Sequence, residues 1–256
     1  MSSLARGQEV KICEGAEEWP PYMYYERVNG KINENKIIGA VKELFDAAIK
    51  LTDLTYSIEL LPWKRCLKYV EHFDLDPRYE VFSNGIYSLK RAKKYWPSIP
   101  LYATHRGVFY SEIKYPQGPS IKKKSDIANY KICGVLGYDY TDELQWAKNI
   151  KIDSAAPSNE KALLKITKGR CDIMIASMEP IYGSVAIGAF KMPNGIKSFP
   201  VPGVKAITFH FWVSKKSPRA TELLTTINTA IMDVIYNQDY KKIFTKYLPD
   251  TPHLYE

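Results

Sequence analysis

The sequence has no long apolar run, few cysteines and no cysteine motif. None of its 256 residues belongs to an apolar stretch near the ~20 residues that cross a bilayer, and the first ten residues lack the apolar core of a secretory signal. Without a CxxC pair, zinc and thiol redox sites are not expected. The cysteines are too few and too widely spaced for a disulfide scaffold: Cys13, Cys66, Cys133 and Cys171. We expect them to be buried and to pack as small apolar residues, and whether any of them pair stays open.

Motifs of catalysis and of nucleic-acid binding are also missing. There is no nucleophile elbow, P-loop or HExxH motif, and the four histidines are scattered. The formal net charge of +8 attracts anions, but the cations are spread along the chain without a nucleic-acid motif. We therefore expect no catalytic residues, no metal, no other cofactor and no nucleic-acid partner. His210, inside a predicted strand, is expected to be a core histidine.

Two runs of alternating strands and helices are present, and each is typical of a βαβαβ unit. The first run has predicted strands at 9–15, 55–61 and 79–86, with helices at 35–51 and 62–73. The second has strands at 130–137, 151–156 and 171–177, with helices at 140–150 and 158–169. A strand at 206–214 and helices at 217–237 and 239–248 complete the chain, with Ser217 expected as an N-cap.

Four segments resemble one known family. They read "EEWPPYMYY", "SNGIYSLKRAKKYWPSIPLY", "KALLKITKGRCDIMIAS", and "FWVSKKSP" followed by "NQDYKKIFTKYL". Their order and spacing resemble the bacterial family 3 solute-binding proteins, relatives of the periplasmic histidine- and glutamine-binding proteins of ABC importers. The resemblance implies an α/β fold with two lobes (type II periplasmic-binding-protein-like), each a mixed sheet flanked by helices. Lobe 1 would comprise residues 1–103 and 206–256, lobe 2 residues 104–205, and two crossing strands would form a hinge.

The resemblance also implies a function. The chain would be the mature, periplasmic form of a precursor with a signal peptide. It would capture a small carboxylate-bearing solute, an amino acid or a related compound, in the cleft between the lobes and deliver it to the membrane permease of an ABC importer. We expect a monomer that closes around its ligand. Two alternatives stay open: a ligand-sensing module of a signalling system, and a dehydratase-like enzyme on the same fold that uses a cleft carboxylate.

Arg91 is the predicted carboxylate clamp of the first lobe. Ser88 and Arg91 match the family's T-x-x-R pattern, and a guanidinium offers paired donors in the plane of a carboxylate, which a lysine does not. The neighbouring lysines are expected to lie on a solvated surface. The alternative for Arg91 is a surface ion-pair residue.

Other residues of the first lobe match positions around the family's ligand. Trp19 takes the place of an aromatic that covers the ligand, with Tyr22 shaping its loop, and Trp63 resembles a second aromatic wall. Core packing is the alternative for Trp19. Arg65 adds an expected anion contact, with an ordinary surface role as its alternative. The residues that flank the ligand before the arginine would be Ser83, Asn84, Gly85 and Ile86.

In the second lobe, Gly137, Tyr138 and Asp139 match the turn from which backbone N–H groups reach the ligand. Ser177 takes the place where amino-acid binders carry an aspartate for the α-ammonium group. Because a buried ammonium without a counter-charge costs several kcal/mol, either another acid replaces that aspartate or the ligand has no ammonium. The candidate acids are Glu17, Glu18, Asp139 and Glu179.

Overall fold

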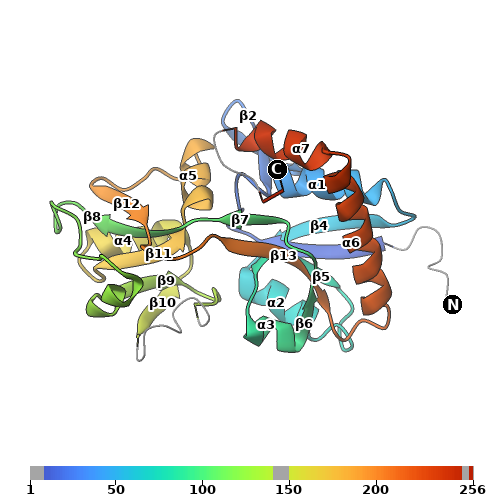
Figure 1. Ribbon diagram of the computed structural model, residues 1–256, viewed down its shortest axis with the longest axis horizontal. Helices are drawn as coiled ribbons and strands as arrows, with labels where there is room; N and C mark the ends of the chain where they lie inside the picture. Colours follow the sequence, from blue (N-terminus) through green and yellow to red (C-terminus); the bar gives the residue numbers. More distant parts are fainter. Residues whose placement is uncertain (1–8, 141–149, 250–253, 256) are drawn as a thin grey trace. The chain divides into compact units, whose positions relative to one another are not determined.

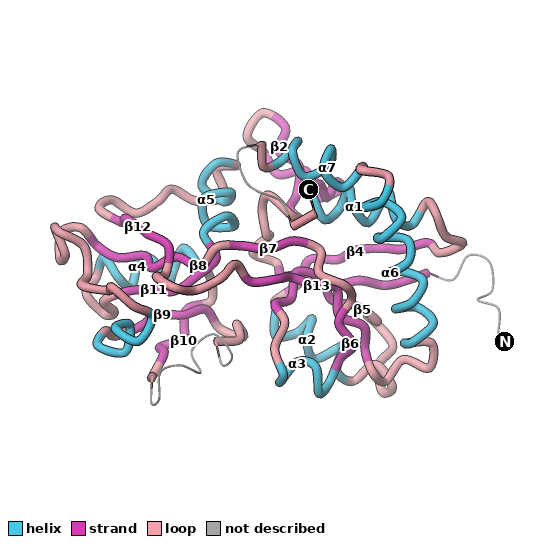
Figure 2. Tube along the Cα trace, viewed as in Figure 1, coloured by secondary structure: helices cyan, strands magenta, loops and turns pink. Residues whose placement is uncertain are grey.

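The computed structural model describes residues 9–140, 150–249 and 254–255. These residues fall into two compact units. Unit 1 contains those up to Ala103 and those from Thr208 onward, and unit 2 contains Thr104–Ile207. Each unit has a mixed sheet flanked by helices, coloured magenta and cyan in Figure 2. The chain therefore leaves unit 1 once and returns to it once.

Unit 1 is built on a sheet with the strand order β4-β1-β5-β13-β6, with β7 also paired to β13 (Figure 1). Strands β4, β1 and β5 run parallel, and β13 runs antiparallel to β5. The elements are β1 (Glu9–Gly15), β2 (Tyr24–Val28), β3 (Lys31–Ile38), α1 (Ala40–Ile49), β4 (Thr55–Leu61), α2 (Trp63–Glu71), β5 (Val81–Ile86), α3 (Leu89–Lys94), β6 (Tyr95–Pro97), β7 (Tyr102–Thr104), β13 (Ile207–Ser214), α6 (Ala220–Tyr236) and α7 (Asp239–Tyr247).

Side-chain alternation along β13 gives this sheet two apolar faces. Phe209, Phe211 and Val213 join a core cluster with residues of α1, α6 and α7, whereas Trp212 joins a second cluster with residues of α2. The Trp212 side chain is fully buried, and its Nε1 donates to the backbone oxygen of Gly85 at 2.9 Å. Burying such a ring removes roughly 200 Å² from water, worth about 5 kcal/mol before entropy losses.

Unit 2 repeats this plan with the strand order β10-β9-β11-β8-β12. Strands β10, β9 and β11 run parallel, and β8 runs antiparallel to β11 and β12. One face of the sheet packs on α4 and α5, the other on η1. The elements are β8 (Arg106–Ser111), η1 (Lys124–Asn129), β9 (Ile132–Val135), β10 (Ile152–Ala156), α4 (Asn159–Thr167), β11 (Ile173–Ser177), α5 (Met178–Ala186) and β12 (Ile196–Pro200).

The two sheets share one topology. In each, the first strand of the βαβαβ run lies between the second, which is at the edge, and the third, and an antiparallel strand follows the third. The predicted fold class, α/β with two units of the same plan, is confirmed. Among the described residues, none of the helices is both long enough and apolar enough to span a bilayer.

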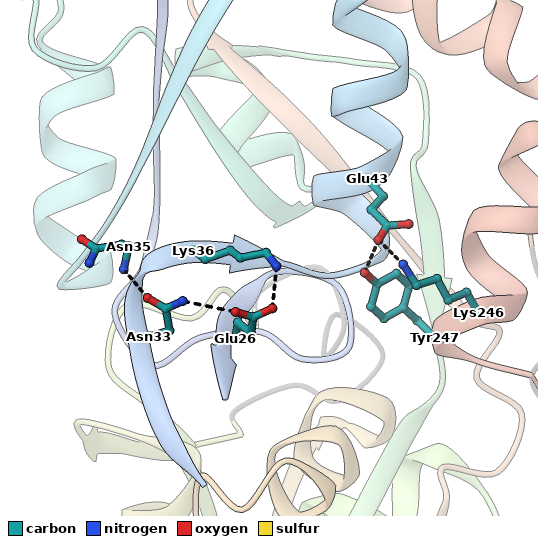
Figure 3. A network of polar contacts seen from close by, with 7 residues as sticks. All are labelled: Glu26, Asn33, Asn35, Lys36, Glu43, Lys246 and Tyr247. Atoms are coloured by element: carbon teal, nitrogen blue, oxygen red, sulfur yellow. Dashed lines mark hydrogen bonds and ion pairs between the residues drawn. The ribbon is translucent and has the colours of Figure 1, made fainter. Parts of the chain in front are cut away.

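Polar contacts tie the last helix of unit 1 to its first (Figure 3). Glu43 on α1 accepts hydrogen bonds from Lys246 Nζ and Tyr247 OH on α7, both at 2.5 Å. On the β2–β3 hairpin, Glu26 accepts from Lys36 Nζ at 2.6 Å. Exposed pairs of this kind contribute at most about 1 kcal/mol each, so the apolar contacts of α1 with α6 and α7 carry most of the stabilisation.

The hairpin before α1 corrects one sequence prediction. The apolar pattern predicts a single helix over residues 35–51, but β3 continues to Ile38 and α1 begins at Ala40. Gly39 between them has a φ of 125°, and a Cβ there would lie 2.4 Å from the backbone oxygen of Tyr22. The chain therefore turns at a position that only glycine fits, and the isoleucines before it suit a strand as well as a helix.

The expected N-cap of α6 is also wrong. The helix starts at Ala220, with Arg219 at the capping position and no side-chain cap hydrogen bond. Ser217 lies earlier in the turn and donates to the Glu80 carboxylate at 2.5 Å. The helix expected at 140–150 lies almost entirely outside the described residues.

All four cysteines are paired in disulfides, a point that the sequence leaves open. They are buried as expected. Cys13 on β1 bonds to Cys66 on α2, and Cys133 on β9 bonds to Cys171 just before β11. Each pair lies within one unit. The partners are 53 and 38 residues apart in sequence and meet because they lie on packed neighbouring elements.

We predict that Cys13→Ala/Cys66→Ala lowers the free energy of unfolding by about 4 kcal/mol, because the disulfide limits the freedom of a long loop in the unfolded chain. Urea unfolding of the oxidised parent and the variant measures the difference. Cys133→Ala/Cys171→Ala is the matched control for unit 2 and should cost a similar amount. Four reactive thiols in the unreduced, denatured parent would contradict the pairing.

Candidate functional site

The candidate site of unit 1 lies where the parallel strands β1 and β5 end. Carboxyl ends of parallel strands are the usual place for ligands in open α/β sheets. Cys13 on β1 is opposite Phe82 on β5, so the next residues, Glu14 and Ser83, come together near this edge. Ser83 and Asn84 are two of the residues that the sequence predicts beside a ligand.

Glu14 is a buried acid that the sequence analysis missed. Its side chain accepts hydrogen bonds from Ser83 Oγ at 2.5 Å, Asn84 Nδ2 at 2.6 Å and the backbone nitrogen of Gly15 at 2.7 Å. Burial raises the pKa of Glu14 to about 7, although these three donors act in the opposite direction. The carboxyl group therefore changes charge close to neutral pH.

The signal for Glu14 is present in the sequence. Val10 and Ile12 are fully buried on β1, and strand alternation places Glu14 on the same face. An acid in phase with buried apolar residues at the carboxyl end of a strand indicates a site.

Hydrogen bonds continue from Glu14 to the predicted covering aromatic. Tyr102 OH donates to Asn84 Oδ1 at 2.8 Å and accepts from Trp19 Nε1 at 2.9 Å. The Tyr102 ring also stacks on Tyr22, with centroids 3.7 Å apart. The chain of bonds from Glu14 through Asn84 and Tyr102 fixes the orientation of the Trp19 indole.

Asn84 holds an uncommon backbone conformation. Its φ of 51° lies in the left-handed region, which costs most non-glycine residues about 1 kcal/mol or more and which asparagine tolerates best. Its side chain is bonded on one side by Glu14 and on the other by Tyr102. Such conformations cluster at ligand sites, because surrounding contacts must hold them.

Arg91 is the buried cation of the basic stretch. Its side chain is only 8% exposed, and its guanidinium donates to the backbone oxygen of Ile86 at 3.0 Å. The guanidinium carbon lies 5.6 Å from the Trp63 ring centre and 6.0 Å from that of Phe82. Ser88 caps α3 by accepting from the Arg91 backbone nitrogen. Unit 1 therefore brings Arg91 and Trp63 together.

The remaining predicted residues of unit 1 are placed differently. Tyr22 is 1% exposed and belongs to the core, so it supports Tyr102 rather than forming a surface. At Gly85 a Cβ would lie 2.6 Å from the Phe82 and Trp212 rings, so packing requires glycine there. Arg65 lines a surface pocket along α2.

In unit 2, Ser177 is buried beside a guanidinium. Its Oγ lies 2.8 Å from Thr104 Oγ1 and accepts from Arg106 NH1 at 3.2 Å. Arg106 is itself 7% exposed. The position where amino-acid binders carry an acid thus has a neutral hydroxyl with a cation next to it.

The other predicted residues of unit 2 form the turn after β9. Gly137 has a φ of 86°, which suits glycine, and Tyr138 and Asp139 follow half-buried. Asn159, the first residue of α4, lies 3.5 Å from the Tyr138 hydroxyl. This part of the chain lies beside the segment 141–149, which is outside the described residues.

Two of the acids considered as replacements for the missing aspartate are engaged within the fold. Glu18 accepts a bidentate pair of bonds from Arg27, at 2.6 and 2.7 Å. Glu179 accepts from the backbone nitrogen of His105 and lies 2.7 Å from its Nδ1. Glu14 is bonded to two of the predicted ligand residues of unit 1, Ser83 and Asn84.

One group of metal-ligand residue types gathers in the described part of the chain, namely Cys133, Asp153 and Cys171. Its two sulfur atoms are joined in a disulfide, and Asp153 forms an ion pair with Lys165. This group is therefore part of the packing of unit 2.

Known structures share this architecture, whereas no protein-family model and no curated sequence matches the chain. A histidine kinase sensor domain with similarity to periplasmic binding proteins is 19% identical, covers 95% of this chain and 97% of its own, and has a TM-score of 0.72. An amino acid ABC transporter substrate-binding protein from Streptococcus pneumoniae, bound to L-arginine, is 16% identical over 94% of both chains, with a TM-score of 0.71. An ancestral amino acid-binding protein, a precursor of cyclohexadienyl dehydratase, is 17% identical over 93% of this chain and 94% of its own, with a TM-score of 0.68.

The chain has the periplasmic-binding-protein fold. At these identities the likeness establishes the architecture, in agreement with the sequence prediction. The solute and the roles of individual residues rest on the geometry of each unit.

We predict that Glu14→Gln changes the pH dependence of stability. Because burial raises the pKa of Glu14 from 4.5 to about 7, the unfolded chain releases this proton at lower pH than the folded chain. The free energy of unfolding of the parent should therefore fall by about 2–3 kcal/mol between pH 5 and pH 8 through this group alone. The glutamine variant should lack that loss.

Urea unfolding at pH 5, 6.5 and 8 measures the effect. Glu9→Gln, at the exposed start of the same strand, controls for the removal of one acidic side chain. Identical pH dependence in the parent and in Glu14→Gln would show that Glu14 does not titrate as described.

Proposed function

We propose that the chain is a solute-binding protein that captures a small carboxylate-bearing solute and delivers it to the membrane permease of an ABC importer. The observation that carries this proposal is the buried Arg91 guanidinium, framed by Trp63 and Phe82 at the end of β5 in this fold. Within a desolvated site, a guanidinium and a carboxylate form two parallel charge-assisted hydrogen bonds. The aromatic rings around it favour an arginine at this position over a lysine.

The remaining predicted residues have supporting roles in this proposal. Trp19 covers the solute, Asn84 contacts it, and Glu14 positions Asn84 and takes part in any contact with a cationic group. Further contacts with the solute are proposed for Arg65 and for the turn formed by Gly137, Tyr138 and Asp139, which the sequence also predicts as ligand residues. The protein binds and releases its solute without a chemical step, and it works as a monomer.

The disulfides support a location outside the cytoplasm. Disulfides form and persist in oxidising compartments and are rare in the reducing cytosol. With one in each unit, both units would gain stability only after export. We therefore place the mature protein in the periplasm or an equivalent extracytoplasmic compartment.

Two other functions are compatible with the same fold. The likeness to a histidine kinase sensor domain supports a module that binds the same solute and signals instead of transporting it. The likeness to a dehydratase precursor supports an enzyme, for which Glu14 is the buried carboxyl group of suitable pKa. Incubation of the purified protein with the solute that co-purifies, followed by mass spectrometry, separates an enzyme from a binder, because a binder returns the solute unchanged.

We predict that Arg91→Ala weakens binding of that solute by about 30-fold to several thousand-fold. This corresponds to the 2–5 kcal/mol lost when a buried carboxylate is left without its partner. Arg91→Lys should recover only part of the affinity, because a point charge does not reproduce two parallel hydrogen bonds. Calorimetry with the solute identified by native mass spectrometry measures both.

Lys93→Ala is the matched control, because Lys93 lies exposed on the same helix. It should change affinity by less than about 1 kcal/mol. If a folded Arg91→Ala variant binds the solute as tightly as the parent, Arg91 does not contact the solute.

We predict that common α-amino acids bind more weakly than matching carboxylates without an amino group, or bind tightly only where a nearby acid replaces the missing aspartate. Ser177 supplies no negative charge, and the Arg106 guanidinium beside it repels an ammonium group. Titration calorimetry with paired ligands, such as glutamate and glutarate, tests this. If amino acids bind tightly, Glu14→Gln, Glu17→Gln and Asp139→Asn reveal whether an acid replaces the aspartate, and tight binding that survives all three overturns the prediction.

A further inference from the structure

The exposed side of α2 forms a basic pocket that the proposed solute site does not explain. The pocket has a volume of about 670 Å³ and extends from the helix into the turn that follows it. Its lining combines cations, an aromatic ring, an apolar side chain and one acid: Lys64, Arg65, Lys68, Tyr69, His72, Leu75 and Asp76.

The acids near this pocket are paired with cations from outside its lining. Glu71 pairs with Lys94 at 2.5 Å, and Asp74 pairs with Lys216 at 3.5 Å. The acid of the lining itself, Asp76, pairs with Arg78 at 3.3 Å. Every acid from Glu71 to Asp76 therefore already has a partner.

The lining cations keep their charge exposed. Within the ranges that the structure describes, Lys64, Arg65 and Lys68 form no ion pair with an acid of this chain. Lys64 and Lys68 are four residues apart on one helix, an arrangement that costs a few tenths of a kcal/mol through repulsion. The pocket thus presents about three positive charges that nothing in the described chain neutralises.

The length of the α2 pocket and the apolar side chains in its lining favour a peptide over a phosphate as the bound partner. The cations from Lys64 to Lys68 cover about 6 Å of the helix axis, and the lining continues to His72, about 12 Å from Lys64, a length that four residues of an extended peptide span and a single phosphate does not. Leu75 is 80% exposed at the rim, and the Tyr69 ring lines the pocket with the Arg78 guanidinium stacked on it. These apolar surfaces suit the carbon atoms of a peptide and offer nothing to an inorganic polyanion.

We infer that the α2 pocket is a docking surface for an acidic segment of a partner protein. Carboxylates spaced along the segment pair with Lys64 and Lys68, while Leu75 and Tyr69 contact its aliphatic parts. The inference goes beyond the proposed function and does not depend on the identity of the solute. Its contacts are electrostatic, so they weaken as salt is added.

The test uses a fluorescent peptide of eight glutamates, measured by anisotropy at low ionic strength. The parent should bind it, and Lys64→Gln/Lys68→Gln should weaken binding about tenfold, since two rim charges are lost. Arg65 is kept in this variant, so the proposed solute site stays intact. The matched control is Lys90→Gln/Lys93→Gln, which removes two exposed cations from α3 and should leave binding within about twofold of the parent.

Other occupants are tested alongside with inorganic pyrophosphate and with vesicles containing phosphatidylglycerol. Loss of peptide binding in the α2 variant alone supports the inference. No binding by the parent, or equal weakening in both variants, overturns it. It is also overturned if pyrophosphate binds as tightly with the same dependence on Lys64 and Lys68, or if only the vesicles depend on them.

Discussion

The hydrogen bonds that join Glu14 to Ser83 and Asn84 organise the candidate site of unit 1. They connect the ends of β1 and β5 at the edge where parallel strands leave room for a ligand. Without them, Asn84 would have no reason to keep its left-handed conformation, and Tyr102 would lose the acceptor that orients it toward Trp19. A single buried carboxyl group thus controls the shape of the surface that the solute would meet.

The arrangement of charges in the two units narrows the chemistry of that solute. Unit 1 offers a buried guanidinium and a carboxyl group that is only partly ionised near neutral pH, and unit 2 offers a second guanidinium beside Ser177. Under the proposed function, both units would therefore favour acidic groups of the solute over basic ones. The same bias toward anions recurs on the outer surface of α2, where the cations face solvent instead of lying in the interior.

Sequence patterns predict most strands, for reasons that the structure makes clear, whereas the role of Arg91 comes from the family resemblance and stays a prediction. The first residues of β1 alternate between exposed and buried, and β13 is a nearly continuous apolar run, as expected for a strand that is buried on both faces. Sequence patterns do not predict the features that depend on contacts between residues far apart in the sequence. The β2–β3 hairpin ends and α1 begins at Gly39, because the backbone there lies too close to Tyr22 for any side chain. Cys13 and Cys66 come within bonding distance only when α2 packs on the sheet. The phase of Glu14 with Val10 and Ile12 marks it as a buried acid, but its hydrogen bonds to Ser83 and Asn84 depend on pairing across the sheet, which the sequence pattern does not give.

Unit 1 is assembled from both ends of the chain, whereas unit 2 is one continuous segment. Strand β13 and helices α6 and α7 leave the ribosome last, yet they supply Phe209, Phe211 and Trp212 to the two cores of unit 1. Until these elements are made, α1 and α2 cover only part of the two faces of β1 and β5, and the apolar residues that remain exposed favour aggregation. Unit 2 is complete before β13, α6 and α7 are synthesised, so its sheet can form first. If the chain is exported before it folds, as we propose, this order helps, because unit 1 is not complete until β13, α6 and α7 have been made.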